Sequence, residues 1–208
     1  MSEPLRVLGL AGSPRRRGNT EILLDQFLSG AEAAGAQVRK VLAAKLDIAG
    51  CIACGGCSGD GVCVVEDDFQ AINQELVESD VIVVAAPLFF WNVPAKLKAL
   101  IDRGQSQWSR KFLVREPLPP TAAGHERRRG VFICVGADPR GYFEGAKWTV
   151  RSFFRVYEAE YWGELLYHQI EARGAIHEHA AAMDEAVSLG ERAVREPWQV
   201  AKEKERDK

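Results

Sequence analysis

Four cysteines stand within thirteen residues of this 208-residue chain: Cys51, Cys54, Cys57 and Cys63. Their spacing is C-x2-C-x2-C-x5-C, and ordinary packing gives no reason for three thiols at a strict interval of three among glycines. Thiolates are soft metal ligands, and short runs of this kind wrap a [4Fe-4S] cluster because each cysteine reaches a different iron. We therefore expect these four residues to be metal ligands, with a [4Fe-4S] cluster as the first hypothesis.

The spacing leaves other chemistry open. Five residues separate Cys57 from Cys63, and the glycines among them permit tight turns that bring Cys63 back to the same cluster. Zinc also takes four cysteines, although paired C-x2-C units farther apart are typical of it. Cys51 with Cys54, or Cys54 with Cys57, is also spaced as a redox-active dithiol. The fifth cysteine, Cys134, lies inside an apolar run and is expected in the core.

The turn from Gly12 to Thr20 is the second candidate site. It lacks the Gly-Lys-Ser/Thr of a P-loop and the G-x-G-x-x-G of a dinucleotide fingerprint. It does precede a helical pattern, and the free N–H groups and dipole at a helix start favour an anion. A single terminal phosphate, as on FMN, suits this turn better than a pyrophosphate. The residues expected to bind it are Ser13, Pro14, Arg15, Asn19 and Thr20. The alternative is a polar loop whose side chains only cap the helix.

The elements that must position these residues follow from the hydrophobic pattern. Apolar runs predict strands at 5–10, 37–42, 80–86, 130–135 and 161–167. Helical patterns between and after them run from about 19–34, 69–76, 94–103, 144–158 and 176–195. This alternation predicts a doubly wound, three-layer α/β/α fold with a five-stranded parallel sheet in the flavodoxin-like order. One domain is expected over 1–196, with the cysteine loop at 50–65 and a charged tail at 197–208.

Loops after the third and fourth strands are expected to hold a flat, partly apolar ring, because ligands of such sheets bind at the carboxyl ends of the strands. The residues concerned are Pro87, Leu88, Phe89, Phe90, Trp91, Asn92 and Gly136. Backbone N–H groups and Asn92 suit the polar end of an isoalloxazine ring, and the aromatic side chains suit its apolar end. The alternative for each aromatic residue is core or interface packing.

The stretch 105–129 is long for a simple connection. It contains Pro117, Pro119, Pro120 and Gly124. We expect it to form an oligomerisation arm, and together with the aromatic-rich helix that follows it this arm predicts a homodimer or homotetramer. A disordered loop is the alternative.

Other polar residues are not expected to do chemistry. Arg127–Arg129 is expected to be a solvated turn before a strand, and His125 has no recognisable partner. His177 and His179 face apart on the expected last helix and do not make a metal pair. Ser13 is not in a G-x-S-x-G elbow, so a hydrolase nucleophile is missing.

Composition excludes several partners. The net charge is −2 and 47% of the residues are apolar, which favours neither nucleic acid nor an anionic membrane. No stretch approaches the roughly 18 to 20 apolar residues of a membrane helix, and no signal-peptide pattern opens the chain. A cytoplasmic protein with reduced thiols is therefore expected.

The two candidate sites together resemble a known family. The turn from Gly12 to Thr20 is similar to the phosphate loop of the NADPH-dependent FMN reductases and iron–sulfur flavoproteins. The likeness extends through 50–65, Asp67-Asp68-Phe69, Ala86-Pro87 and 98–103, and it reaches the second half of the chain only by general layout. It implies bound FMN and supports the cluster. Similar reductases also exist that keep such cysteines without a cluster, and similar members place a tyrosine near the positions of Phe89 and Phe90.

The resemblance and the residues favour an FMN-dependent oxidoreductase that passes electrons between FMN and a [4Fe-4S] cluster. Its donor or acceptor would be ferredoxin, a quinone or NAD(P)H. No side chain needs to act as acid or base, because the flavin carries the chemistry. The alternatives are a cluster-free NAD(P)H-dependent FMN or quinone reductase and a non-catalytic flavodoxin-like redox sensor.

Overall fold

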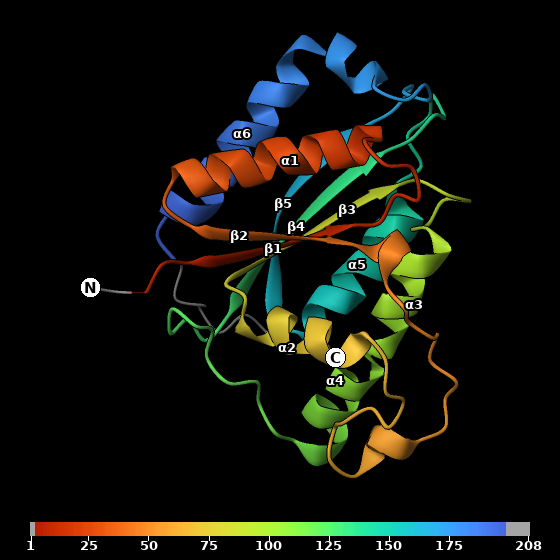
Figure 1. Ribbon diagram of the computed structural model, residues 1–208, viewed down its shortest axis with the longest axis vertical. Coiled ribbons are helices and arrows are strands. Elements are labelled where there is room, and N and C mark those ends of the chain that lie inside the picture. The colour runs from red at the N-terminus through yellow and green to blue at the C-terminus, as the bar shows by residue number, and fades with distance from the viewer. Residues whose placement is uncertain (1–2, 199–208) are drawn as a thin grey trace.

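A computed structural model describes residues 3–198. Its centre is a five-stranded, wholly parallel sheet in the order β2-β1-β3-β4-β5 (Figure 1). The strands are β1 (Arg6–Ala11), β2 (Gln37–Leu42), β3 (Val81–Pro87), β4 (Arg128–Val135) and β5 (Ala159–Tyr167). This order confirms the predicted flavodoxin-like fold, in which the chain reverses direction across the sheet between β1 and β3.

Helices cover both faces of the sheet and make the three predicted layers (Figure 1). One face carries α1 (Asn19–Ala33) and α6 (Ala180–Arg195). The other carries α2 (Phe69–Glu78), α3 (Ala95–Arg103) and α5 (Glu144–Val156). The shorter elements are the 3-10 turns η1 (Ala43–Lys45), η2 (Gly56–Ser58) and η4 (Ala175–Glu178), the helix α4 (Gln105–Ser109) and a π-helical turn, η3 (Arg110–Val114).

The core lies in two apolar layers, one on each face of the sheet. Residues 81–86 of β3 are fully buried, as an unbroken apolar run in a central parallel strand should be. Cys134 is also fully buried, which confirms its expected place in the core. On the outer side, α1 and α6 approach so closely that a Cβ on Gly30 would stand 2.1 Å from the Val187 carbonyl oxygen. Glycine is therefore required at that crossing.

The stretch 105–129 folds against the domain along part of its length. It forms α4 and η3 and then runs in extended form below the amino ends of the strands (Figure 1). Leu118 and Thr121 are buried, and the Ala122 N–H donates to the Glu78 carbonyl at 3.1 Å. The role of this segment in oligomerisation stays a prediction.

Two sequence predictions at the amino edge of the sheet are wrong. Arg128 and Arg129 are buried inside β4 and its surroundings rather than solvated. Arg129 donates to the carbonyl oxygens of Ala193, Glu196 and Pro197, and its guanidinium lies 3.8 Å from the ring centre of Trp198. Backbone carbonyls at the end of α6 thus satisfy a charge that the local sequence placed in water.

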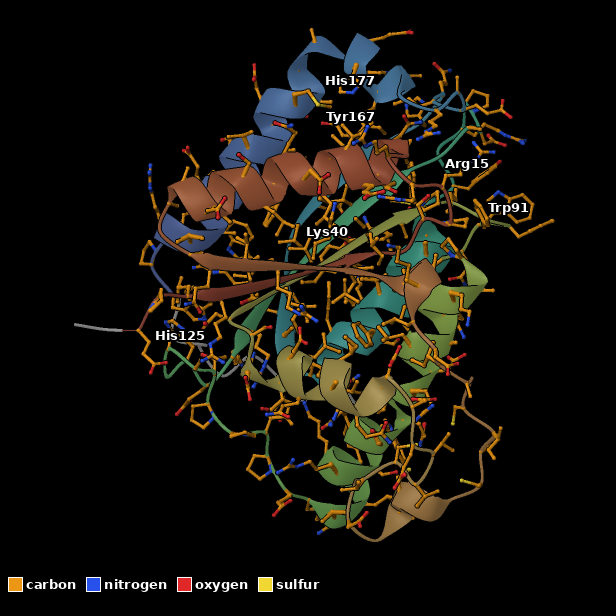
Figure 2. All side chains as sticks on the ribbon, in the orientation of Figure 1. Arg15, Lys40, Trp91, His125, Tyr167 and His177 are labelled. Atoms are coloured by element: carbon orange, nitrogen blue, oxygen red, sulfur yellow. The ribbon has the colours of Figure 1, made fainter. Side chains whose placement is uncertain are left out.

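His125 also has a partner that the sequence did not reveal. Its Nδ1 lies 2.9 Å from Oδ1 of the fully buried Asp80, and its ring stacks on Trp198 with centres 4.0 Å apart. His125 is at the opposite end of the molecule from Arg15 and Trp91 (Figure 2). This cluster therefore secures the amino edge of the sheet and is remote from the carboxyl edge. Among residues 3–198, no helix has the length and apolar character needed to cross a bilayer.

Candidate functional site

The turn after β1 leaves the start of α1 open. The Gly12 N–H donates to the Ala85 carbonyl at 2.7 Å, which fixes the turn beside β3. Ser13 Oγ accepts the Arg15 N–H at 3.1 Å and donates to the Arg15 carbonyl at 3.2 Å. The first helical bond comes from Ile22 to the Gly18 carbonyl at 3.0 Å. The amides of residues 19–21 precede that bond, so they point out of the helix start as an anion site requires.

A cavity of about 200 Å³ lies at this helix start, on the carboxyl edge of the sheet. Seven of the predicted residues line it: Ser13, Arg15, Asn19, Thr20, Pro87, Leu88 and Phe89. Gly18, from the predicted turn, and Ala137, next to the predicted Gly136, also line it. The structure adds lining residues that the sequence did not indicate: Val135, Ile170, Glu171 and Arg173. The two arginines, the helix amides and the buried Thr20 suit a phosphate, so the residues present fit the terminal phosphate of FMN.

The side chain of Asn19 has a different task from the one predicted. Its Oδ1 accepts the N–H groups of Gly174 at 2.8 Å and Ile176 at 3.3 Å, and its Nδ2 donates to the Ala172 carbonyl at 2.9 Å. Asn19 therefore fastens the loop after β5 to the start of α1. This contact brings Arg173 to the cavity, and the signal for it was the position of 171–174 after a parallel strand that ends at the same edge.

A carboxylate stands next to this anion site. Glu21 is buried, which by itself raises its pKa, but hydrogen bonds from Lys40 at 3.0 Å and from the Arg17 N–H at 2.6 Å outweigh burial and lower the pKa. Glu21 is thus ionised, and Lys40 compensates its charge. Arg15 and Arg173 line the cavity and form no ion pair with a described residue, so the two arginines outnumber Glu171, the one carboxylate in its lining.

The loop after β3 is a two-residue hairpin turn. The N–H groups of Phe89 and Asn92 donate to each other's carbonyl oxygens at 2.8 and 2.9 Å. Phe90 and Trp91 between them have φ of +47° and +58°, a left-handed conformation that favours asparagine and glycine. Phe90 is fully exposed and Trp91 is 57% exposed, so neither belongs to the core. The turn holds two large aromatic side chains in solvent beside the cavity.

Five predicted site residues do not line the cavity: Pro14, Phe90, Trp91, Asn92 and Gly136. The Oδ1 of Asn92 accepts the Val93 N–H at 2.8 Å, so it caps its own loop. The Gly136 N–H donates to Tyr167 and its carbonyl accepts from Ile170, so its backbone is used within the sheet edge. Ala137, one residue later, faces the cavity.

The four clustered cysteines line a second cavity, of about 400 Å³. Cys51 and Cys54 are exposed, Cys57 and Cys63 are half-buried, and none forms a disulfide. Left-handed turns at Gly55 and Gly61 shape the loop. Cys57 Sγ lies 3.4 Å from Ser109 Oγ, which ties the loop to α4.

The donors of this second cavity are thiols, the ligands that iron–sulfur clusters take. Within residues 3–198, no three cysteine, histidine, aspartate or glutamate side chains converge closely enough to hold one ion. Four thiols that line one cavity match the donor type and number of a four-cysteine iron–sulfur cluster.

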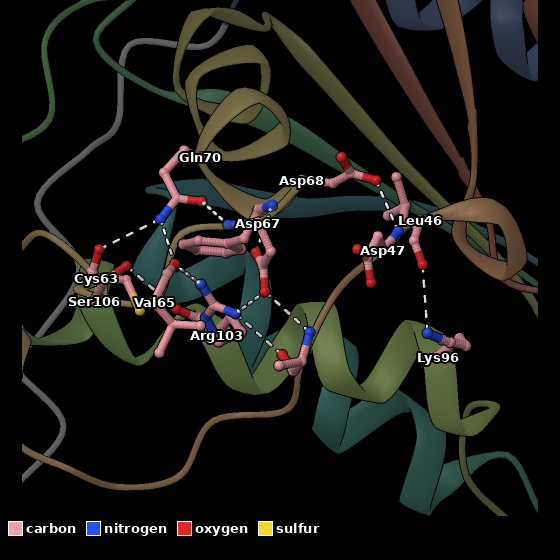
Figure 3. A network of polar contacts seen from close by, with 12 residues as sticks. Leu46, Asp47, Cys63, Val65, Asp67, Asp68, Gln70, Lys96, Arg103 and Ser106 are labelled. Carbon is pink, nitrogen blue, oxygen red and sulfur yellow. Dashed lines mark hydrogen bonds and ion pairs between the residues drawn. The ribbon is translucent and has the colours of Figure 1, made fainter.

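A buried ion pair closes the base of the cysteine loop (Figure 3). Arg103 Nη1 donates to Asp67 Oδ2 at 2.6 Å, and Asp67 accepts the Ala49 N–H at 3.0 Å. Gln70 Nε2 donates to the carbonyl oxygens of Cys63, at 3.4 Å, and Val65. The loop is therefore anchored at both ends to α2 and α3.

The two cavities have no lining residue in common. Helix α3 begins beside the turn of Phe90 and Trp91 and ends with Arg103 at the cysteine cavity. In Figure 1 the cysteine loop lies beside α4, away from the end of the sheet where α1 begins. A loop that follows β2 starts at the carboxyl edge of the sheet, which would place it near the flavin, but residues 43–50 carry this loop along the face of the domain, away from the anion cavity of the same chain.

Comparisons with known proteins agree with this geometry. Residues 5–154 match the family model described as NADPH-dependent FMN reductase. The iron-sulfur flavoprotein of Methanosarcina thermophila is 37% identical over 148 residues, which cover 71% of this chain and 70% of that protein.

Solved structures share the fold at low sequence identity. The azoreductase of Bacillus anthracis str. Sterne superposes with a TM-score of 0.64 at 16% identity, over 90% of this chain and 99% of that one. The NAD(P)H:quinone oxidoreductase from Methanothermobacter marburgensis gives 0.63 at 14% identity, over 95% of this chain and 100% of that one. Because the family model matches residues 5–154, this chain belongs to the NADPH-dependent FMN reductase family and is an FMN-dependent oxidoreductase.

Proposed function

We propose that this protein is an electron-transfer flavoprotein that combines FMN with a [4Fe-4S] cluster. The observation that carries the proposal is that Cys51, Cys54, Cys57 and Cys63 line one cavity in a chain that also has an anion cavity at the start of α1. When bound, FMN supplies two-electron chemistry and a cluster supplies one-electron transfer.

The chain contributes binding and orientation. The amides at the start of α1, with Arg15 and Arg173, neutralise the phosphate of FMN, and Pro87, Leu88 and Phe89 form the apolar wall next to it. The aromatic turn of Phe90 and Trp91 lies on the rim and limits access to the ring. Pro14, Asn92 and Gly136 lie in the loops after β1, β3 and β4 and shape these loops rather than touching the cavity.

The four cysteines are proposed as the cluster ligands. Their spacing and their common cavity support this role, as does the 37% identity to the iron-sulfur flavoprotein of Methanosarcina thermophila. The electron donor or acceptor is proposed to be ferredoxin, a quinone or NAD(P)H. A homodimer or homotetramer is proposed because the stretch 105–129 is long for a connection and because Phe90, Trp91 and Trp148 are large exposed apolar side chains.

A second candidate is a cluster-free NAD(P)H-dependent FMN or quinone reductase. The fold shared with the NAD(P)H:quinone oxidoreductase from Methanothermobacter marburgensis favours it, because that protein's name describes such a reaction. In this case the cysteine cavity would contain thiols only.

Anaerobic purification followed by iron, sulfide and flavin assays separates the candidates. A brown protein whose visible absorption disappears in Cys54→Ser, while FMN stays bound, supports the flavoprotein with a cluster. A yellow protein without iron that is bleached by NAD(P)H supports the second candidate. Protein that takes up no FMN in a titration would overturn both.

A further inference from the structure

One buried side chain joins the two ends of the cysteine loop. Arg103, the last residue of α3, is 1% exposed. Its Nη1 donates to the Ala49 carbonyl at 3.1 Å and to Asp67 at 2.6 Å, and its Nη2 donates to the Val65 carbonyl at 2.7 Å. Ala49 precedes the first cysteine by two residues and Val65 follows Cys63 by two. The loop is therefore closed by a single guanidinium before anything binds in it.

The same guanidinium has one donor left over. Arg103 Nε is buried and makes no hydrogen bond to any described residue, whereas Nη1 and Nη2 have partners and the guanidinium carbon lies 4.7 Å from the ring centre of Phe69. Arg103 lines the cavity of the four cysteines, and Cys63 is close enough to interact with its charge. A buried donor without a partner is costly, so its position beside a cavity indicates an acceptor that arrives with the ligand.

A purely structural role accounts for only part of this arrangement. The bonds to Ala49, Asp67 and Val65 use Nη1 and Nη2 and are sufficient to close the loop. They do not explain why this positive charge lies at the wall of a cavity lined by thiols. Nor do they explain why the Nε–H of Arg103 has no hydrogen-bond acceptor among the described residues. Thiolates that bind a metal group bring net negative charge, which an adjacent arginine stabilises.

We propose that Arg103 is the positioning residue of the cysteine cavity: it closes the loop through Nη1 and Nη2, and its Nε–H donates to the Cys63 sulfur when that sulfur is a ligand of an anionic iron–sulfur group. This inference rests on the proposed function and goes beyond it, because it assigns a residue outside the cysteine motif. Donation to a ligand sulfur favours the more negative, reduced state, so Arg103 raises the reduction potential of the group.

The test compares Arg103→Gln, which removes the charge and the fork of donors, with Arg103→Lys, which keeps the charge alone. Lys98→Gln is the matched control, since it removes the same charge from an exposed pair with Asp102 on the same helix and does not touch the loop. FMN binding of each variant reports whether the domain is folded.

Two readouts are measured. In the metal-free protein, amide hydrogen exchange of residues 51–63 should be faster in both Arg103 variants and unchanged in the control. After anaerobic reconstitution with iron and sulfide, resistance to an iron chelator should fall about ten- to a hundredfold in Arg103→Gln. The midpoint potential should shift downward in both variants, and more in Arg103→Gln.

The outcomes distinguish this proposal from the function on which it rests. Wild-type protein that binds FMN and a cluster, with Arg103→Gln equal to it in potential and chelator resistance, would overturn the role of Arg103 and leave the function standing. Wild-type protein that takes up no iron would overturn the cluster itself, and the donor role of Nε with it.

Discussion

The ring of Trp91 meets the ring of Tyr142 edge to face, with centres 6.1 Å apart and an angle of 90° between the planes. This contact joins the loop after β3 to the loop after β4. Arg140 lies 4.8 Å from the ring centre of Tyr142 and pairs with Asp138 at 3.2 Å, so the joined loops continue into a charged rim. The rim stands at the same end of the sheet as Arg15 (Figure 2). The two loops therefore form one continuous border beside the anion cavity.

Replacing Trp91 by glycine should change the free energy of unfolding of flavin-free protein by less than about 1 kcal/mol. Glycine adopts the left-handed conformation without the steric cost that tryptophan has there, which stabilises the folded state by about 1 to 2 kcal/mol. Loss of the Tyr142 contact costs roughly 0.5 to 1.5 kcal/mol, and the added freedom of glycine in the unfolded chain costs about 0.5 to 1 kcal/mol. These terms cancel, and urea unfolding checks the result.

Trp91→Ala is the matched variant, because it loses the contact and keeps the strain, and it should be less stable than Trp91→Gly. A loss of about 3 kcal/mol or more in Trp91→Gly, the size expected for a core aromatic residue, would show that Trp91 is structural.

Arg15→Ala should weaken FMN binding about tenfold and leave the fold intact, because one charge-assisted bond to the phosphate is lost at an exposed site. Arg173→Ala should have a similar effect, since Arg173 lines the same cavity. Arg16→Ala is the control, as Arg16 is an exposed neighbour that does not line the cavity. Quenching of flavin fluorescence during titration measures the affinities. Equal affinities for all three variants and wild type would place the phosphate elsewhere.

The sequence was sufficient for the sheet and the first turn but not for contacts between distant segments. The five strands follow from apolar runs such as 81–86, and the order follows from five β–α units with an anion turn after the first. The polar setting of Asn19 in the sequence predicts a phosphate contact, whereas the partners of its side chain lie 153 residues or more away along the chain. No local pattern reports such a bond.

Buried charges were missed for the same reason. Arg128 and Arg129 look like a solvated run until the carbonyl oxygens of Val77, Ala193 and Glu196 are brought to them by folding. Likewise the sequence indicates Arg103 only as part of the segment 98–103 that resembles the family. Its bonds to both ends of the cysteine loop depend on how α3 packs beside residues 49–67.

Asn19 anchors the loop after β5 and also lines the anion cavity, and two substitutions test these positions. Asn19→Ala removes bonds to Ala172, Gly174 and Ile176, so it should lower the free energy of unfolding by about 1 to 3 kcal/mol and speed hydrogen exchange in the loop after β5. Its FMN affinity should also fall, because Arg173 is no longer held at the cavity.

Asn19→Asp keeps an oxygen acceptor for Gly174 and Ile176 but adds a negative charge at the anion site. It should lose the stability that the bond to the Ala172 carbonyl provides, because a carboxylate oxygen cannot donate to it, and it should also lose FMN affinity. Unfolding curves and flavin titration of the pair check this; an Asn19→Asp protein that binds FMN as tightly as wild type would contradict the position of the anion site.

Glu21 should make the protein sensitive to acid. Its pKa is lowered in the folded state by Lys40 and the Arg17 N–H against the opposing effect of burial. A carboxyl group whose folded pKa is below its unfolded pKa, normally about 4.3, stabilises the fold above that unfolded value. This stability is lost as the pH falls through the lower, folded pKa. Glu21→Gln should therefore be less stable than wild type at pH 7, and the difference should shrink as the pH drops below about 4.3.

The matched control is Asp25→Asn, which removes the other, exposed carboxylate partner of Lys40. Because surface pairs contribute little, its unfolding free energy should stay close to wild type across the same pH range. Urea unfolding between pH 3 and 7 distinguishes Glu21→Gln from Asp25→Asn. The protein is measured without flavin, because binding of the FMN phosphate at the same helix start would add its own stabilisation. A Glu21→Gln protein whose deficit is constant with pH would mean that the side chain stabilises the turn by shape, through its bond to the Arg17 N–H, rather than by charge.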